Sequence, residues 1–185
     1  KAFNIMVILA VPMIVGTQYF ATDIMKLVAG DEFDASGPIL QLLIFACGAI
    51  FFGNMFAHAI IAINKQKKVI SAYIFTAITS LSAYIILIPK LSYLGAAYVT
   101  IYSELVIALA SVYIVWKYTK FLPSLDVFVK SIGASLAMLA FLLLLQSKIT
   151  LGLLFSITIC FFSYFIFLYI FKGIAKEDLL SLINK

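Results

Sequence analysis

The sequence has 185 residues, of which 65% are hydrophobic and 11% are charged, and its mean hydropathy is +1.17. This balance excludes a soluble domain and predicts an all-α polytopic transmembrane helix bundle, because several apolar runs have the roughly 20 residues that cross a bilayer. The net charge of +5 comes from lysines alone, which lie in short loops at the ends of those runs. No basic surface with interleaved aromatic residues is present, so we predict no nucleic-acid partner.

The first predicted span covers residues 3–21 and contains Pro12 and Gly16. Both residues loosen a helix, so we expect a kink there. The acidic segment 22–38 follows, and its composition predicts a short interfacial turn before a helix that begins at Pro38.

The second predicted span covers residues 38–63 and contains the polar residues Gln41, Asn54 and His58. Asn54 and His58 are one helical turn apart and share a face with Cys47. We therefore expect this helix to have one side protected from lipid.

The third predicted span covers residues 69–88 and places small residues on one stripe, as a helix–helix interface in a membrane does. That stripe consists of Ala72, Thr76, Thr79 and Ala83. The stretch Ile88-Pro-Lys-Leu-Ser-Tyr-Leu-Gly-Ala-Ala97 then closes one span with a proline and opens the next on small residues. We therefore expect a tight turn between the third and fourth spans.

The fourth predicted span continues to Trp116 and carries Glu104 near its centre. An acid at the centre of a transmembrane helix costs roughly 2.5–3.5 kcal/mol on insertion scales, so it should face protein or water. Steps of three or four residues from Glu104 define a face of small or weakly polar residues, which predicts that neighbouring helices pack there. That face consists of Ala97, Thr100, Ala108 and Ser111.

Two further spans are predicted at residues 131–145 and 149–171, and both are apolar nearly all round, as lipid-facing helices are. A re-entrant hairpin made from these two segments is the alternative. Residues 172–185 predict a cytoplasmic amphipathic tail lying at the surface. The chain thus divides into a four-helix part at 1–120, two additional apolar helices at 121–171, and this tail.

The lysines predict the orientation, because cytoplasmic loops carry an excess of them. One side collects Lys1, Lys65, Lys67, Lys68, Lys117, Lys120, Lys130, Lys172, Lys176 and Lys185, and the other receives Lys26, Lys90 and Lys148. We expect both ends of the chain to be cytoplasmic. The basic loops also have a weaker possible role in contacting anionic lipid headgroups.

No catalytic constellation, metal site or cofactor motif is present in the sequence, so we predict a protein that is not an enzyme. Glu104 is the principal candidate for ion coupling or contact with a polar substrate, and its alternative role is to accept hydrogen bonds that lock helices together. Thr100 lies on the same face. His58 and Asn54 are candidates for an aqueous path, or for interfacial residues. Gln41 is a candidate for the same pathway or, with Thr17 and Gln18, for an interhelical hydrogen bond.

An ordered set of short motifs gives the sequence a resemblance to a known family. These are Gly30-Asp-Glu-Phe-Asp-Ala-Ser36, Ile39-Leu-Gln-Leu-Leu43, Ala62-Ile-Asn-Lys-Gln-Lys67, and Leu87-Ile-Pro-Lys-Leu-Ser-Tyr-Leu-Gly-Ala-Ala97 with Ser103-Glu104. Over residues 11–120 the chain resembles the C-terminal part of polysaccharide biosynthesis proteins, the Wzx-type oligosaccharide flippases. That superfamily also holds multidrug and toxin extrusion transporters and lipid II flippases.

The resemblance implies that the chain is the C-terminal portion of a longer, two-lobed transporter with an N-terminal lobe as its partner. It implies a polyprenyl-linked oligosaccharide as substrate, moved across the cytoplasmic membrane by alternating access for cell-surface polysaccharide such as O-antigen. Because the chain has no arginine, the cations for a diphosphate would be lysines or would lie in the other lobe. A cation-coupled exporter of small molecules from the same superfamily is the alternative, and a membrane-embedded polyprenyl-sugar transferase is a third.

Overall fold

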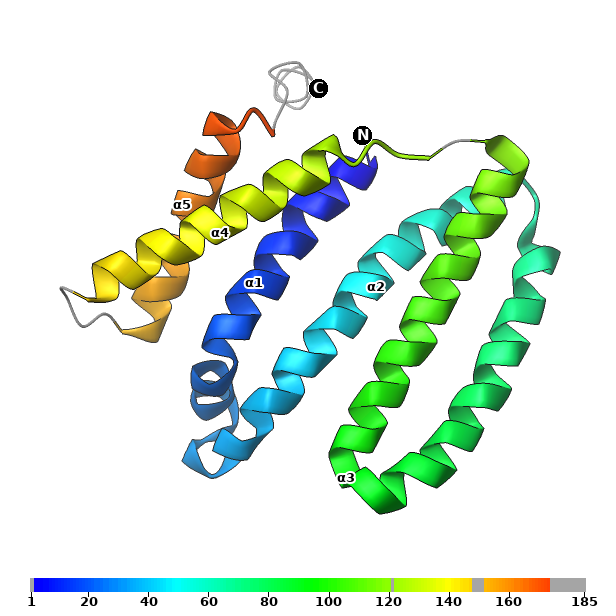
Figure 1. Cartoon of the computed structure of the whole chain (residues 1–185), viewed down its shortest axis with the longest axis horizontal. Coiled ribbons are helices and arrows are strands. Elements are labelled where there is room, and N and C mark those ends of the chain that lie inside the picture. The colour runs from blue at the N-terminus through cyan, green and yellow to red at the C-terminus, as the bar shows by residue number, and fades with distance from the viewer. Residues whose placement is uncertain (1, 121, 148–151, 174–185) are drawn as a thin grey trace.

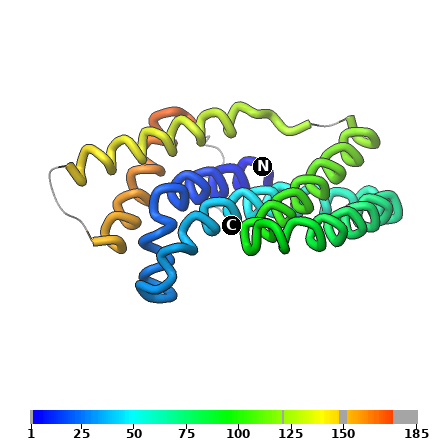
Figure 2. Tube along the Cα trace, turned by 60° about the horizontal axis from the view of Figure 1, so that its bottom comes forward, coloured from blue at the N-terminus to red at the C-terminus, as the bar shows by residue number. Residues whose placement is uncertain are grey.

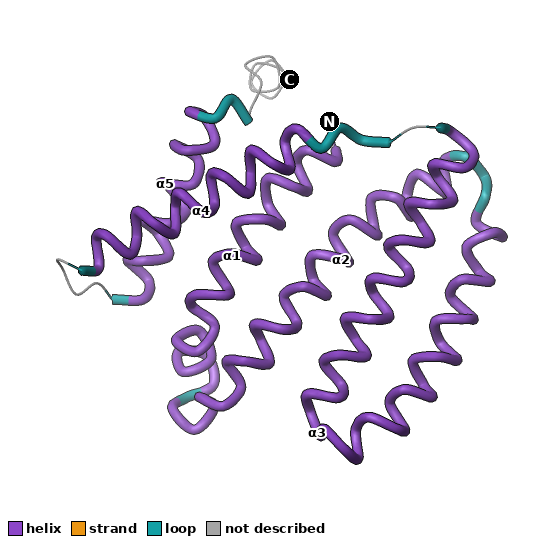
Figure 3. The backbone as a smooth tube through the Cα atoms, in the orientation of Figure 1, coloured by secondary structure: helices purple, strands orange, loops and turns teal. Residues whose placement is uncertain are grey.

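The computed structural model describes residues 2–120, 122–147 and 152–173, and these residues form helices joined by turns, with no strand among them (Figure 3). The elements are α1 (Ala2–Ala29), the short 3-10 helix η1 (Asp31–Ser36), α2 (Gly37–Ala62), α3 (Gln66–Thr119), α4 (Asp126–Gln146) and α5 (Leu153–Ile170). The predicted all-α class is confirmed.

Within the described residues, five helices are long and apolar enough to cross a membrane. The longest of them, α3, folds back on itself at Ser92, whose backbone is not helical, so it supplies two crossing segments (Figure 1). The result is a bundle with six crossing segments, as the sequence predicts. At about 1.5 Å per residue α4 and α5 are each close to the roughly 30 Å of a hydrocarbon core, which favours two full spans over a re-entrant hairpin.

The helices lie side by side in an order that differs from their order in the chain. α2 packs between α1 and the second half of α3, and the first half of α3 lies at the outer edge (Figure 1). The segment after α3 returns across the end of α2, so that α4 and α5 pack against α1 (Figure 2). The last two helices are therefore attached to the first helix of the chain.

The predicted end of the first span is wrong, because α1 continues well beyond Ala21 to Ala29. Between Ala21 and Gly30 the sequence has no glycine or proline. The helix ends at Gly30, where φ is +100° and the Gly30 N–H donates to the Lys26 carbonyl at 3.0 Å. The predicted interfacial turn is thus a helical extension followed by η1. Lys26 also contacts Asp34 at 3.4 Å, which ties η1 to the end of α1. Helix α2 begins at Gly37, one residue before the predicted Pro38, which lies in its first turn.

The turn within α3 is as tight as the sequence predicts. Ser92 has φ +49° and ψ −130°, and Pro89 lies one turn before it. A Cβ atom on Gly95 would lie 2.5 Å from the Leu87 carbonyl oxygen and 2.8 Å from the Leu87 carbonyl carbon. The two halves of α3 can therefore approach this closely only because residue 95 has no side chain.

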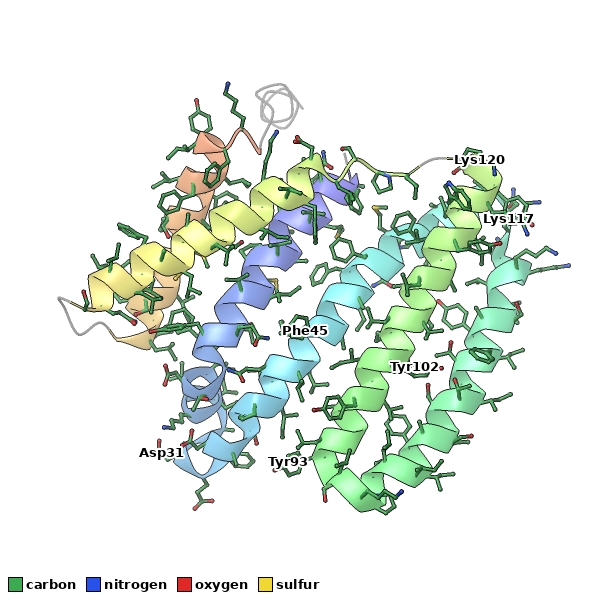
Figure 4. The ribbon with its side chains drawn as sticks, in the orientation of Figure 1. Asp31, Phe45, Tyr93, Tyr102, Lys117 and Lys120 are labelled. Carbon is green, nitrogen blue, oxygen red and sulfur yellow. The ribbon has the colours of Figure 1, made fainter. Side chains whose placement is uncertain are left out.

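The two ends of the bundle differ in charge. The described residues at the end where α2 and α3 meet include Lys117 and Lys120, while Asp31 and Tyr93 lie at the opposite end (Figure 4). Most of the described lysines lie at the first end, and most of the described acids lie at the second. This is the asymmetry on which the predicted orientation depends. The predicted amphipathic tail lies outside the described residues, apart from its first two.

Candidate functional site

Glu104 lies near the centre of the second half of α3 and is half-buried. Within the described part of the chain, no hydrogen bond or ion pair reaches its carboxylate. An intramembrane carboxyl group without such a partner is costly, and residues of this kind mark substrate or ion pathways.

Hydroxyl groups join the two halves of α3 within about one helical turn of the position of Glu104. The Tyr102 hydroxyl donates to Thr79 Oγ1 at 3.1 Å, and Tyr102 lies between the two halves (Figure 4). Nearer the turn, the Tyr84 hydroxyl lies 3.1 Å from Thr100 Oγ1. Because Thr100 already donates to the Ala96 carbonyl at 3.0 Å, Tyr84 is the donor of that bond. We call these four residues the hydroxyl ladder.

The hydroxyl groups on the first half of α3 are not available to Glu104 as donors. Thr76 donates to the Ala72 carbonyl at 2.8 Å and Ser80 donates to the Thr76 carbonyl at 2.6 Å. Thr79 likewise donates to backbone carbonyls within its own helix. These side chains present oxygen lone pairs to the interior of the hairpin, so a protonated carboxyl group or a ligand hydroxyl is the chemistry that they can accept.

The small face predicted for the fourth span packs against α2. Ala97, Ala108 and Ser111 are buried, and a Cβ atom on Gly53 of α2 would lie 3.5 Å from the Ala108 Cα and Cβ atoms. Such a close approach of backbones is typical of small-residue interfaces in membranes. Glu104 lies at the edge of this packed face, one turn from Ala108, rather than at its buried centre.

Gln41 does form an interhelical hydrogen bond, as one of its two predicted roles requires. Its side-chain Nε2 donates to the Gln18 carbonyl at 2.8 Å, and Gln18 Nε2 donates to the Gln41 carbonyl at 2.7 Å. The pair joins α1 to α2 near the start of α2, far along the helix from Asn54. Thr17, the third residue of this group, lines a groove on α1 that is described below.

We expect the two glutamines to contribute additively to stability. Each side chain bonds to a backbone carbonyl, so Gln18→Leu leaves the bond from Gln41 in place, and the reverse also holds. Each substitution should lower the free energy of unfolding by about 0.6 kcal/mol, the typical value for a hydrogen bond between membrane helices. Equilibrium unfolding of the two single variants and the double variant checks this, and a strong coupling between the two sites would contradict it.

Asn54 and His58 lie on a face of α2 that no other helix of the described chain covers, and the protection of this face from lipid stays a prediction. Both side chains are exposed, as is Cys47 on the same face. The physical reason is the position of α2, which buries one side against α1 and another against α3 and leaves this face uncovered. Gly53 contacts Ala108, which lies one turn after Glu104. Along the bundle axis Asn54 is therefore about one turn from the level of Glu104, and His58 lies another turn away. The five predicted residues therefore do not form one cluster.

Sequence reasoning missed a polar contact that joins three helices around Tyr164 of α5, a buried side chain. Its hydroxyl donates to the Ile8 carbonyl of α1 at 2.9 Å and lies 2.7 Å from Ser131 Oγ of α4. The Ile8 carbonyl needs this donor, because residue 12 is a proline and has no N–H for it. Since Tyr164 donates to Ile8, Ser131 donates to Tyr164. Pro12 signals that a free carbonyl exists, but the sequence does not show what bonds to it.

An apolar groove of about 320 Å³ lies beside this contact, between α1 and α5. Pro12, Gly16 and Thr17 line it on one side and Cys160 and Phe161 line it on the other. Its composition suits a hydrocarbon chain rather than a polar molecule.

We expect Tyr164→Phe to lower the free energy of unfolding by about 1–3 kcal/mol, because it leaves the Ile8 carbonyl buried without its donor. Adding Pro12→Ala should recover part of this loss, because residue 12 then supplies an N–H to that carbonyl. Ser131→Ala is the control with a smaller effect, since Tyr164 keeps its bond to Ile8. Thermal unfolding in detergent measures all three, and a double variant less stable than Tyr164→Phe alone would contradict the assignment.

Comparisons with family models, with curated proteins and with solved structures give no match to this chain. The function is therefore inferred from the geometry of the site and from the sequence motifs. Among the described residues, no group of histidine, cysteine and acidic side chains could hold a metal ion. What the site offers is one carboxyl group and several hydroxyl oxygens at mid-membrane depth.

Proposed function

We propose that this chain is part of a flippase that moves a polyprenyl-linked oligosaccharide across the cytoplasmic membrane for cell-surface polysaccharide synthesis. The observation that carries the proposal is the half-buried Glu104 carboxyl group, which has no partner among the described residues and lies one helical turn from Thr100 of the hydroxyl ladder. Carboxylates and hydroxyl groups bind sugar hydroxyls by hydrogen bonds, and carboxyl groups are rare within a transmembrane helix unless they serve a function such as transport. The ordered motifs of the sequence support the same class.

In this proposal the chain forms one lobe of a carrier that works by alternating access. The exposed face of α2, with Asn54 and His58, would face the other lobe, since a polar face is costly in lipid. The lysine-rich end of the bundle would be cytoplasmic, in keeping with the charge rule for loops. The lobe alone would then lack the opposite wall that encloses a substrate, so we expect no translocation from this chain by itself.

A cation-coupled exporter of the same superfamily is the second candidate. Glu104 favours it, because a mid-membrane carboxyl group can take up a proton in one conformation and release it in the other. A membrane-embedded sugar transferase is the third candidate, although the described residues offer it no nucleophile paired with a base.

Depleting the native protein that carries this chain tests the proposal. A flippase predicts that lipid-linked oligosaccharide accumulates while surface polysaccharide falls and drug susceptibility stays unchanged. Increased susceptibility to toxic cations with normal surface polysaccharide would instead support the exporter. Loss of the lipid-linked sugar itself would support the transferase.

A further inference from the structure

Five lysines gather where the turn between α2 and α3 meets the last turns of α3. They are Lys65, Lys67, Lys68, Lys117 and Lys120, and we call them the lysine patch. Lys65 Nζ lies 4.8 Å from the centre of the Tyr118 ring, so the turn and the end of α3 are in direct contact. The two groups of lysines, about fifty residues apart in the sequence, therefore form one surface.

Aromatic rings underlie the patch. Lys120 Nζ lies 5.0 Å from the centre of the Trp116 ring, and Lys117 Nζ lies 5.9 Å from the centre of the Tyr113 ring. Trp116 and Tyr113 are partly exposed at the end of a helix long enough to cross the membrane. Tryptophan and tyrosine at such positions mark the headgroup level of a bilayer. The patch therefore lies at the depth of lipid phosphates.

No acidic side chain pairs with the lysine patch within the described part of the chain. The described acid at this end is Asp126, and it pairs with Lys130 of its own helix at 2.5 Å. The first turn of α3 carries Lys67 and Lys68 and no acid, although the N-terminus of a helix is itself positive. Lys67 and Lys68 repel each other and the positive N-terminal end of the α3 dipole. An anion bound beside them would therefore stabilise the fold.

We propose that the lysine patch binds the phosphodiester headgroup of an anionic phospholipid. A soluble phosphate and an acidic protein segment would meet the same charges. The bilayer is favoured because the aromatic rings sit at the interface and because α2 and α3 fix the patch beside the lipid headgroups. The site is separate from the proposed transport site, since the patch lies at the end of the helices and Glu104 lies near the centre of the second half of α3.

The intrinsic fluorescence of Trp116 reports this site directly, because Trp116 is the single tryptophan of the chain. The chain is reconstituted in vesicles of phosphatidylcholine and phosphatidylglycerol in equal amounts, with bromine near the glycerol end of the acyl chains of one lipid or the other. Brominated phosphatidylglycerol should quench Trp116 more strongly than brominated phosphatidylcholine. The association constant for phosphatidylglycerol relative to phosphatidylcholine should be about five or more, because each lysine near anionic headgroups contributes about 1 kcal/mol. Raising the salt concentration should lower that preference.

Variants separate a specific site from the general charge of this surface. The triple variant with Lys65→Gln, Lys117→Gln and Lys120→Gln should bind both lipids about equally, with a relative association constant close to one. Lys130→Gln with Lys172→Gln removes two lysines from the same end of the bundle and should leave the preference unchanged, as should Lys26→Gln with Lys90→Gln at the opposite end. If the triple variant does not fold, Lys120→Gln alone and the salt series of the unaltered chain give the same test.

Three results would overturn the proposal. The first is equal quenching by both brominated lipids in the unaltered chain. The second is an equal loss of preference in the patch variant and in the Lys130 and Lys172 control, which would mean a diffuse surface charge. The third is that inorganic phosphate abolishes the preference where chloride of the same ionic strength does not, which would identify a site for soluble phosphate.

Discussion

Gly95→Ala should prevent stable folding of the α3 hairpin, with a loss of about 3 kcal/mol in the free energy of unfolding. The new methyl group would lie 2.5 Å from the Leu87 carbonyl oxygen, which belongs to the backbone and cannot rotate away as a side chain can. The halves of α3 would separate, and the bonds of Tyr84 to Thr100 and Tyr102 to Thr79 would lengthen or break. Thermal unfolding and the yield of folded protein in detergent measure this loss.

Gly16→Ala is the matched control, because it makes the same chemical change inside another crossing helix. No atom lies within 4 Å of the place where its Cβ would be. Alanine is also the better helix former by about 1 kcal/mol. We therefore expect this variant to be as stable as the unaltered chain or slightly more stable, and similar losses at both glycines would contradict the account of the hairpin.

Glu104→Gln should reduce transport by the native protein about tenfold or more, with normal expression. The substitution keeps the shape and most of the hydrogen-bonding capacity of the side chain but removes its charge and its ability to titrate. Hydrogen bonds to a charged group contribute about 1.5–3 kcal/mol, which corresponds to at least a tenfold change. Under the coupling role, the pH dependence of transport should also become flat.

Glu32→Gln provides the comparison for this variant, since Glu32 is exposed on η1, the short helix before α2. We expect its transport to equal that of the unaltered protein. If Glu104→Gln also keeps normal transport with an unchanged pH dependence, Glu104 is a packing residue and has no part in coupling or in binding the substrate.

The number of crossing segments could be predicted from the sequence because hydropathy and length depend on local composition. The boundaries were less predictable. The first span was predicted to end at Ala21 because the acidic segment 22–38 follows it, yet a helix does not stop at an exposed acid, and α1 continues to Ala29. The turn at Ser92 was predictable, since Pro89 and Gly95 are the residues that such a turn requires.

The neighbours of each helix could not be predicted from the same pattern. Periodicity places Asn54 and His58 on one face of α2, but whether another helix covers that face depends on the order of helices in space, which leaves it exposed. For the same reason Tyr164 was missed, because its partners Ile8 and Ser131 come from helices distant in the sequence. The interhelical hydrogen bonds of Gln18 and Gln41 were among the predicted roles, and polar amides in consecutive spans have few other partners.

Translocation of a fluorescent polyprenyl-linked oligosaccharide in proteoliposomes tests the central proposal most directly. The native protein that carries this chain should make the labelled sugar accessible to a membrane-impermeant quencher from the opposite leaflet, and its Glu104→Gln variant should do so about tenfold more slowly. Vesicles without protein give the background rate. Translocation at that background rate by the folded, unaltered protein would contradict the proposed function.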